Sequence, residues 1–216
     1  MTSSSVKICG LSTPETLDTA VQAGARYVGF VFFPPSPRAV SSQQAAELAS
    51  RVPPGIAKVG LVVAPDDALL DEISRAVPLD MIQVHKVDDP VRLAEIGARV
   101  GLPVIAAAPI AKPEDVDEAL RIAEPAQMIL FDAKPAEDAT LPGGNGVRFD
   151  WRLLSTRRIP KPWMLAGGLT PDNVAEAIAL TGAKIVDVST GVETSPGEKS
   201  ADYITAFVRN ACVPQL

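Results

Sequence analysis

The sequence contains little histidine, little cysteine and no excess of positive charge, and each shortage narrows the possible functions. Among its 216 residues there is one histidine, His85, and there are two cysteines, Cys9 and Cys212. Two cysteines near opposite ends of the chain make no disulfide framework, and with one histidine they leave a metal site short of ligands. The formal net charge of −6 argues against nucleic acid or an anionic membrane as a partner.

Long apolar runs are also missing. No stretch approaches the length of a transmembrane helix, and the first residues, MTSSSVK, contain no apolar segment of a secretory signal. We therefore expect a cytoplasmic protein without a membrane partner. We also expect one domain, residues 1–216, because α/β barrels of this length commonly do not divide.

Short apolar runs alternate with amphipathic stretches eight times along the chain. The expected strands cover residues 6–9, 27–33, 57–63, 81–85, 104–107, 128–131, 163–166 and 185–188. A helix is expected after each strand, and the one after the seventh strand is expected to have Thr170 as N-cap and Pro171 in its first turn. Eight such units without a composition break favour a closed parallel (β/α)8 barrel over an open doubly wound sheet.

In a barrel of this kind, function lies where the strands end and the following loops begin. That rule puts nine residues on one rim: Cys9, Arg38, His85, Asp132, Gly167, Gly168, Ser189, Thr190 and Gly191. Five of them form two small-residue turns, 167–168 and 189–191. Glycine lets main-chain N–H groups approach an anion, and a helix N-terminus adds donors, so the two turns predict a phosphate site. A glycine pair that merely ends a strand is the alternative.

Polar residues are also expected inside the barrel. Alternate side chains share one face of a strand, so Lys7 and Cys9 should point inward. The last strand neighbours the first in a closed barrel, which predicts an ion pair between Lys7 and Asp187 beneath the phosphate turn. An ammonium makes a nearby thiol easier to ionise, so Cys9 is a candidate base or nucleophile, with an inert buried cysteine as the alternative. Gln83 and His85 are expected to form a hydrogen-bonded pair.

Asp132 and Arg38 complete the set of candidates. A carboxyl group at a half-buried mouth tends to have a raised pKa and can act as a general acid, although a loop-capping aspartate is an equal alternative. Arg38 offers a planar fork for a substrate carboxylate, unless it is simply solvated in its proline-rich loop. The loop 133–149 contains Gly143 and Gly144 in LPGGNG, and we expect it to close over a ligand.

Seven segments, in order, resemble the phosphoribosylanthranilate isomerase family of tryptophan biosynthesis. They are VKICGL at 6–11, GFVFFPPSPRAV at 29–40, KVGLVV at 58–63, FDAK at 131–134, LPGGNGVRFDW at 141–151, LAGGLTPDNV at 165–174 and VDVSTGVETSPGEK at 186–199. The resemblance covers residues 6–208, and an ordered set of this kind is far more specific than any one motif.

The resemblance implies the Amadori rearrangement of N-(5'-phosphoribosyl)anthranilate to 1-(2-carboxyphenylamino)-1-deoxyribulose 5-phosphate, the third step from chorismate. It implies that Asp132 is the general acid, which protonates the furanose ring oxygen, and that Cys9 is the general base, which removes the proton from the second sugar carbon. Arg38 would lie against the anthranilate carboxylate, and the phosphate would bind to the two small-residue turns. The resemblance implies no metal and no organic cofactor, and it leaves monomer and homodimer open.

Three positions depart from the family pattern. Lys86 stands in QVHK where a glycine is common, the fifth strand VIAAAPI lacks a basic residue after its isoleucine, and LPGGNGV replaces LPGGTGK. The competing interpretations are another phosphosugar enzyme on the same barrel, such as a ribulose-phosphate epimerase or an indole-forming enzyme, and a non-catalytic phosphate-binding scaffold. An epimerase would need several histidine ligands, and retention of both Cys9 and Asp132 opposes the scaffold.

Overall fold

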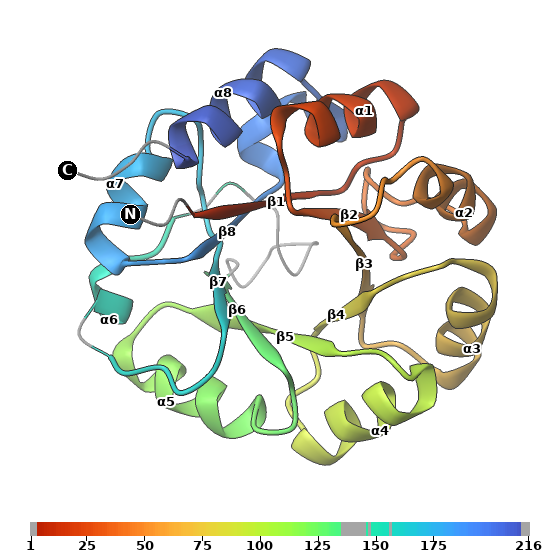
Figure 1. Ribbon diagram of the computed structural model, residues 1–216. Helices are drawn as coiled ribbons and strands as arrows, with labels where there is room; N and C mark the ends of the chain where they lie inside the picture. The colour runs from red at the N-terminus through yellow and green to blue at the C-terminus, as the bar shows by residue number, and fades with distance from the viewer. Residues whose placement is uncertain (1–3, 135–145, 147, 156, 213–216) are drawn as a thin grey trace.

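The computed structural model describes residues 4–134, 146, 148–155 and 157–212. Its centre is a closed barrel of parallel strands that pair in chain order from β1 to β8, seen end-on in Figure 1. The strands are β1 (Ser5–Cys9), β2 (Tyr27–Val31), β3 (Ala57–Val63), β4 (Met81–His85), β5 (Val104–Ile110), β6 (Met128–Ala133), β7 (Trp163–Leu165) and β8 (Ile185–Val188). The predicted (β/α)8 barrel is therefore confirmed.

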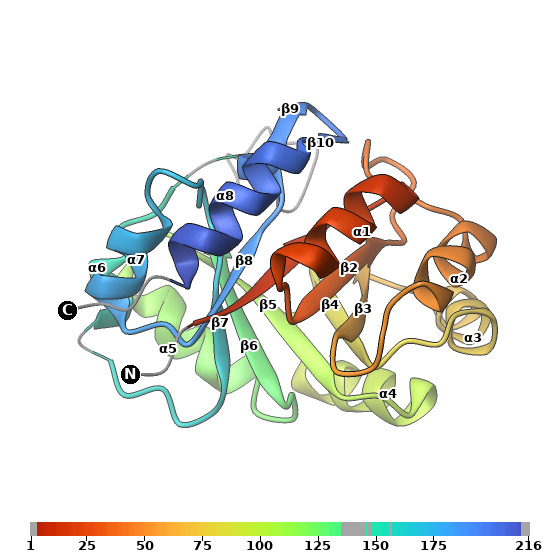
Figure 2. The same ribbon diagram turned by 45° about the horizontal axis from the view of Figure 1, so that its top comes forward.

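Helices surround the barrel on all sides in Figure 1. They are α1 (Pro14–Ala23), α2 (Ser42–Ser50), α3 (Asp67–Ala76), α4 (Pro90–Val100), α5 (Pro113–Ile122), α6 (Arg152–Ser155), α7 (Val174–Thr181) and α8 (Ala201–Ala211). Between β8 and α8 the chain forms the 3-10 turn η1 (Thr190–Val192) and a hairpin of β9 (Glu193–Ser195) and β10 (Glu198–Lys199). Figure 2 shows this hairpin at the top of the molecule. In the part of the chain just defined, no helix has the length and apolar character to cross a membrane.

Local capping interactions mark the ends of several helices. The side chain of Thr13 accepts the N–H of Thr16 before α1, and Ser41 accepts that of Gln44 before α2. Gly24 ends α1 with φ of 99°, a conformation that glycine adopts without a steric penalty.

Four strands end elsewhere than predicted, among them β6, which ends at Ala133 and not at 131, and β7, which ends at Leu165 and not at 166. β2 ends at Val31 and not at residue 33, because the chain turns there and returns at Ala39, which forms a bridge with Val31. β5 continues past 107 to Ile110 because its register with β6 persists that far. Its register with β4 ends at Ala106, so the missing N–H of Pro109 costs no ladder hydrogen bond on that side.

The predicted start of α7 is wrong, and the difference affects the glycine turn at 167–168. Asn173, and not Thr170, occupies the N-cap position, so the helix begins at Val174. The Asn173 side chain instead closes the preceding turn: its Oδ1 accepts the Thr170 N–H at 2.8 Å, and its Nδ2 donates to the Gly168 carbonyl at 3.0 Å. This amide holds the glycine turn against the helix.

The apolar core has two parts. The larger part lies between the strands and the helices and includes Val6 and Ile8. A smaller cluster fills the barrel interior with Val59, Ile105, Met128, Leu130, Met164 and Ala166. Lys7 alternates with Val6 and Ile8 and is fully buried, in agreement with the predicted inward orientation.

Lys86, directly after β4, has φ of 54°, in the left-handed region that a Cβ atom disfavours. We expect Lys86→Gly to raise the free energy of unfolding by about 1 kcal/mol, because glycine relieves this strain. Urea unfolding followed by tryptophan fluorescence measures the change. Lys86→Ala keeps the Cβ atom and is the matched control, so an equal gain from alanine would contradict the explanation.

Candidate active site

A buried ion pair lies at the centre of the barrel. β1 and β8 are neighbours with Lys7 in register with Asp187, and the Lys7 Nζ lies 2.8 Å from the Asp187 Oδ1. Burial alone would lower the pKa of the Lys7 ammonium, but the negative charges of Asp187 and of an ionised Cys9 outweigh it and raise that pKa. The predicted pair is confirmed, and Lys7 stays charged.

Cys9 ends β1 and is buried at the mouth of the barrel. It faces Gly29 of β2, where an added Cβ atom would come within 3.1 Å of the Cys9 Sγ. Burial raises the pKa of the Cys9 thiol, while the Lys7 ammonium acts in the opposite direction. Lys7 lowers the pKa of the thiol, as expected, but loss of hydration raises it by more. The expectation that Cys9 ionises more easily than an ordinary thiol is therefore wrong.

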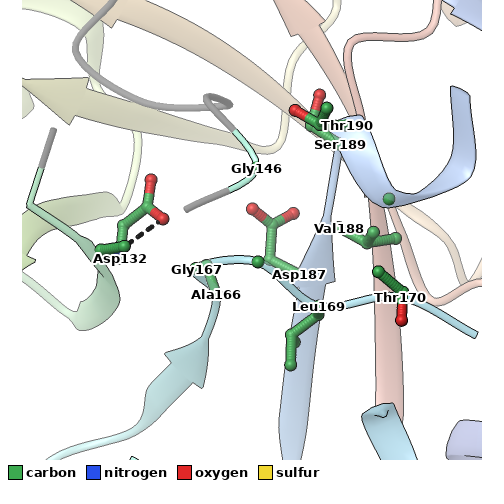
Figure 3. A pocket seen from close by; sticks show the side chains of 13 residues that line it. Asp132, Gly146, Ala166, Gly167, Leu169, Thr170, Asp187, Val188, Ser189 and Thr190 are labelled. Atoms are coloured by element: carbon green, nitrogen blue, oxygen red, sulfur yellow. Dashed lines mark hydrogen bonds between the residues drawn. The ribbon is translucent and has the colours of Figure 1, made fainter. Parts of the chain in front are cut away.

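Asp132 lies near the end of β6 and lines the same mouth (Figure 3). Burial raises the pKa of its carboxyl group to about 7, although the Ala133 N–H that donates to its Oδ1 at 2.8 Å acts to lower it. Both interpretations of Asp132 therefore hold. Its carboxyl group accepts the local capping hydrogen bond, and its pKa is raised. It is half-buried and holds its proton in a large fraction of molecules near neutral pH.

The two small-residue turns come together around one cavity. This cavity has a volume of about 250 Å³. Its lining includes Gly167, Gly168, Thr170, Ser189, Thr190 and Gly191, with Asp132 and Asp187 beside them in Figure 3. An added Cβ atom at Gly191 would lie 1.9 Å from the Leu169 carbonyl oxygen, so the two turns touch through their main chains. Main chain that borders a cavity so closely is typical of anion sites.

Arg38 is buried and not solvated, so the alternative of a solvated loop arginine is wrong. Its side chain crosses Gly10, where an added Cβ atom would lie 2.7 Å from the Arg38 Cδ. Its Nε and Nη2 donate to the two carboxylate oxygens of Glu193 at 2.7 and 2.8 Å, and Nη2 also donates to the Thr190 Oγ1 at 3.3 Å. Arg38 therefore connects the loop after β1, at Gly10, to Glu193 and to the 189–191 turn, while its binding of a substrate carboxylate stays a prediction.

Glu193 and Lys199 are site residues that the sequence analysis did not single out. The Lys199 Nζ lies 2.6 Å from the Glu193 Oε1, and the two residues pair across the β9–β10 hairpin. The signal was present as opposite charges on either side of a Ser-Pro-Gly turn, because such charges face each other when the turn closes a hairpin.

Gln83 and His85 form the predicted pair inside the barrel, with 2.8 Å between the Gln83 Nε2 and the His85 Nε2. Burial, followed by the charge of Lys7, lowers the pKa of His85 to about 3, so its imidazole is neutral at physiological pH. Gly143 and Gly144, and with them the predicted closure of the loop, lie outside the described residues.

Comparisons with known proteins agree with this geometry. The sequence model of the N-(5'phosphoribosyl)anthranilate (PRA) isomerase family matches residues 6–210. An N-(5'-phosphoribosyl)anthranilate isomerase of Paracoccus denitrificans (strain Pd 1222) is 59% identical over 212 residues, which cover 98% of this chain and 99% of the relative. The crystal structure of phosphoribosyl anthranilate isomerase from Thermotoga maritima has a TM-score of 0.84 at 34% identity, over 96% of this chain and 98% of that one. A phosphoribosyl anthranilate isomerase in complex with reduced 1-(o-carboxyphenylamino)-1-deoxyribulose 5-phosphate has a TM-score of 0.79 at 32% identity, over 96% and 98% of the two chains.

Removal of Lys7 tests the central ion pair. We expect Lys7→Met to lower the free energy of unfolding by about 3 kcal/mol, because it leaves the buried Asp187 carboxylate without its partner. Lys7→Met combined with Asp187→Asn removes both charges and should recover most of that loss. Urea unfolding at neutral pH measures both proteins. An equal loss in the single and double variants would show that the lysine contributes packing alone.

Proposed function

Because the chain belongs to the N-(5'-phosphoribosyl)anthranilate isomerase family, we propose that Cys9 is the general base and Asp132 the general acid of its reaction. The protein is an isomerase of tryptophan biosynthesis, and it converts phosphoribosylanthranilate to 1-(2-carboxyphenylamino)-1-deoxyribulose 5-phosphate. One observation carries the assignment of roles. Asp132 lines the cavity of the two small-residue turns, Ser189 of the same lining donates to the carbonyl oxygen of Cys9, and burial raises the pKa of both the carboxyl group and the thiol.

The first step requires an acid. Asp132 donates its proton to the furanose ring oxygen, the bond from that oxygen to the first sugar carbon breaks, and the nitrogen lone pair forms a carbon–nitrogen double bond. A carboxyl group with a pKa of about 7 suits this role, because it still carries a proton near neutral pH and releases it readily.

The second step requires a base. The Cys9 thiolate takes the proton from the second sugar carbon, and the electron pair of that bond moves toward the iminium nitrogen. The resulting enolamine tautomerises to the ketone. The Lys7 ammonium, which lowers the pKa of Cys9 against the effect of burial, stabilises the thiolate in this step.

The ends of the substrate are bound on either side of the reacting carbons. The phosphate is assigned to the turns of Gly167–Gly168 and Ser189–Gly191, and the anthranilate carboxylate to Arg38, whose aliphatic side chain crosses Gly10, the residue after Cys9. The partner is thus a small phosphorylated aminosugar, and we propose that the protein acts in the cytoplasm. The family match opposes both alternatives, the epimerase and the scaffold without chemistry.

Turnover is tested by the decay of anthranilate fluorescence when the protein meets freshly generated phosphoribosylanthranilate. We expect Cys9→Ser and Asp132→Asn each to lower kcat by a factor of at least about 100, because each lacks one of the two proton-transfer groups. Cys212→Ser is the matched control, since Cys212 follows α8 and its thiol contacts the Ser4 carbonyl. Full activity in either site variant would reject its assigned role.

The pH dependence of kcat/KM follows from the two raised pKa values. The active state carries one proton on the pair, with Asp132 protonated and Cys9 ionised. Below pH of about 7 the pair holds two protons, and above the pKa of Cys9 it holds none, so we expect a bell-shaped profile. The lower limb reports Asp132, and the upper limb lies above the ordinary range of a thiol because Cys9 is buried.

Residual activity of Asp132→Asn gives the check on this profile. It should lack the limb near pH 7, and because the amide has no proton to lose, the activity should instead rise as Cys9 ionises and stay level above the pKa of this thiol. A limb near pH 7 that survives in this variant would assign it to another group, and His85 is not available for that role because the pKa of its imidazole is about 3.

A further inference from the structure

The β9–β10 hairpin carries a buried ion pair although its turn is exposed. The side chains of Lys199 and Glu193 are 1% and 2% exposed, whereas residues 194–196 between them are exposed. Burial of two charges on a small surface hairpin is costly unless other groups satisfy them. The contacts of these two side chains therefore indicate why they are buried.

Glu193 holds the guanidinium of Arg38. Both carboxylate oxygens accept hydrogen bonds from Arg38, at 2.7 and 2.8 Å, and the main-chain N–H of Gly197 donates to Oε2 at 3.3 Å. Burial would raise the pKa of Glu193, but Arg38 and Lys199 outweigh it and lower that pKa. Glu193 thus stays ionised and fixes the plane of the Arg38 fork.

Lys199 holds the 189–191 turn. Besides its bond to Glu193, its Nζ donates to the Ser189 carbonyl at 3.0 Å and to the Ser189 Oγ at 3.1 Å. The Ser189 Oγ in turn donates to the carbonyl oxygen of Cys9 at 3.2 Å. All three protons of the ammonium have acceptors, which a neutral side chain of this length cannot reproduce.

Lys199 also adds positive charge close to the thiol. The titratable or charged groups that line the interior around Cys9 are Lys7 on β1, His85 on β4, Asp132 on β6, Asp187 on β8, Lys199 on β10, and Arg38 over Gly10. Of these, the ammonium groups of Lys7 and Lys199 favour the ionised thiol, and Asp187 opposes it. Burial lowers the pKa of Lys199 itself, although Glu193 opposes this.

We propose that Lys199 is a positioning residue that joins the 189–191 turn to Arg38 through Glu193, and that its charge supports the Cys9 thiolate. One ammonium thereby sets the separation between the group that binds the phosphate and the group that binds the carboxylate. The same positive charge also stabilises the Cys9 thiolate. This inference rests on the proposed function, because it takes Cys9 as the base and Arg38 as the carboxylate-binding residue.

The test compares Lys199→Gln with Lys199→Arg. Both are made with Cys212→Ser, which leaves Cys9 as the one thiol in the chain. Appearance of the Cys9 thiolate is followed by ultraviolet absorbance against pH without substrate, with the variant that also carries Cys9→Ser as the blank for tyrosine. We expect the thiolate to appear at higher pH in Lys199→Gln than in its parent, and the charge retained in Lys199→Arg to restore most of the difference.

Steady-state kinetics test the positioning. We expect Lys199→Gln to raise KM by about tenfold, because the 189–191 turn loses the ammonium that holds Ser189, and Glu193, which holds Arg38, loses its second cationic partner. Lys161→Gln is the matched control, since Lys161 also donates three hydrogen bonds, to the carbonyl oxygens of Ala123, Glu124 and Ala126, and precedes β7 at the other end of the barrel. This control should leave the titration and KM unchanged.

Either of two results overturns the proposal. One is a Cys9 titration in Lys199→Gln that coincides with its parent, and the other is an unchanged KM. If Lys199→Gln does not fold, Lys199→Met replaces it and is judged by the same two measurements. Because the titration contains no substrate, absence of turnover in the parent protein would reject the proposed function while the effect of Lys199 on the thiol is still decided.

Discussion

Lys7 carries a charge at the centre of the barrel with none of its surface exposed to solvent. A lysine in that place is tolerable only with a partner, and the partner can come only from a strand that the closed barrel puts alongside β1. Asp187 on β8 supplies it in direct register. The pair joins the first strand to the last, so it can form only when the barrel is closed.

The polar groups around this pair all reflect the balance between lost hydration and nearby charge. Burial raises the pKa values of Cys9 and Asp132 and lowers that of His85, while Lys7 acts on each of them. The result is a protonated or half-protonated acid, a thiol that ionises with help from two ammonium groups, and a neutral imidazole. In these circumstances an acid and a base can stand in one mouth in opposite protonation states.

Small residues make this arrangement possible. Gly29 leaves space for the Cys9 side chain, Gly10 lets Arg38 cross next to it, and Gly191 lets one turn touch the main chain of the other. An added Cβ atom would clash at Gly10 and Gly191 and would crowd the Cys9 thiol at Gly29. The cavity is therefore shaped by close approach of main chains, and the charged hairpin pair of Glu193 and Lys199 then holds the outer wall.

Much of this was predictable from the sequence. Apolar periodicity and turn residues determine the eight strand–helix units, and the period of two along a strand determines that Lys7 faces inward and lies in reach of Asp187. The small-residue turns and the placement of Asp132 at a strand end follow from the same rules. Some of these features depend on residues that are close together in the sequence. The others follow once the barrel is known to close, because closure makes the first and last strands neighbours.

The tertiary structure decided the rest, because it depends on what surrounds each group. Cys9 looks easy to ionise beside Lys7 in the sequence, but the extent of its burial reverses the balance. Arg38 is separated from Glu193 by more than 150 residues, so only the folded chain shows that the arginine is buried and held. Asn173, and not Thr170, occupies the cap position of α7, and its amide binds back to Thr170 and Gly168 in the preceding turn. Burial and long-range pairing are properties of the packed molecule, and no local pattern encodes their magnitude.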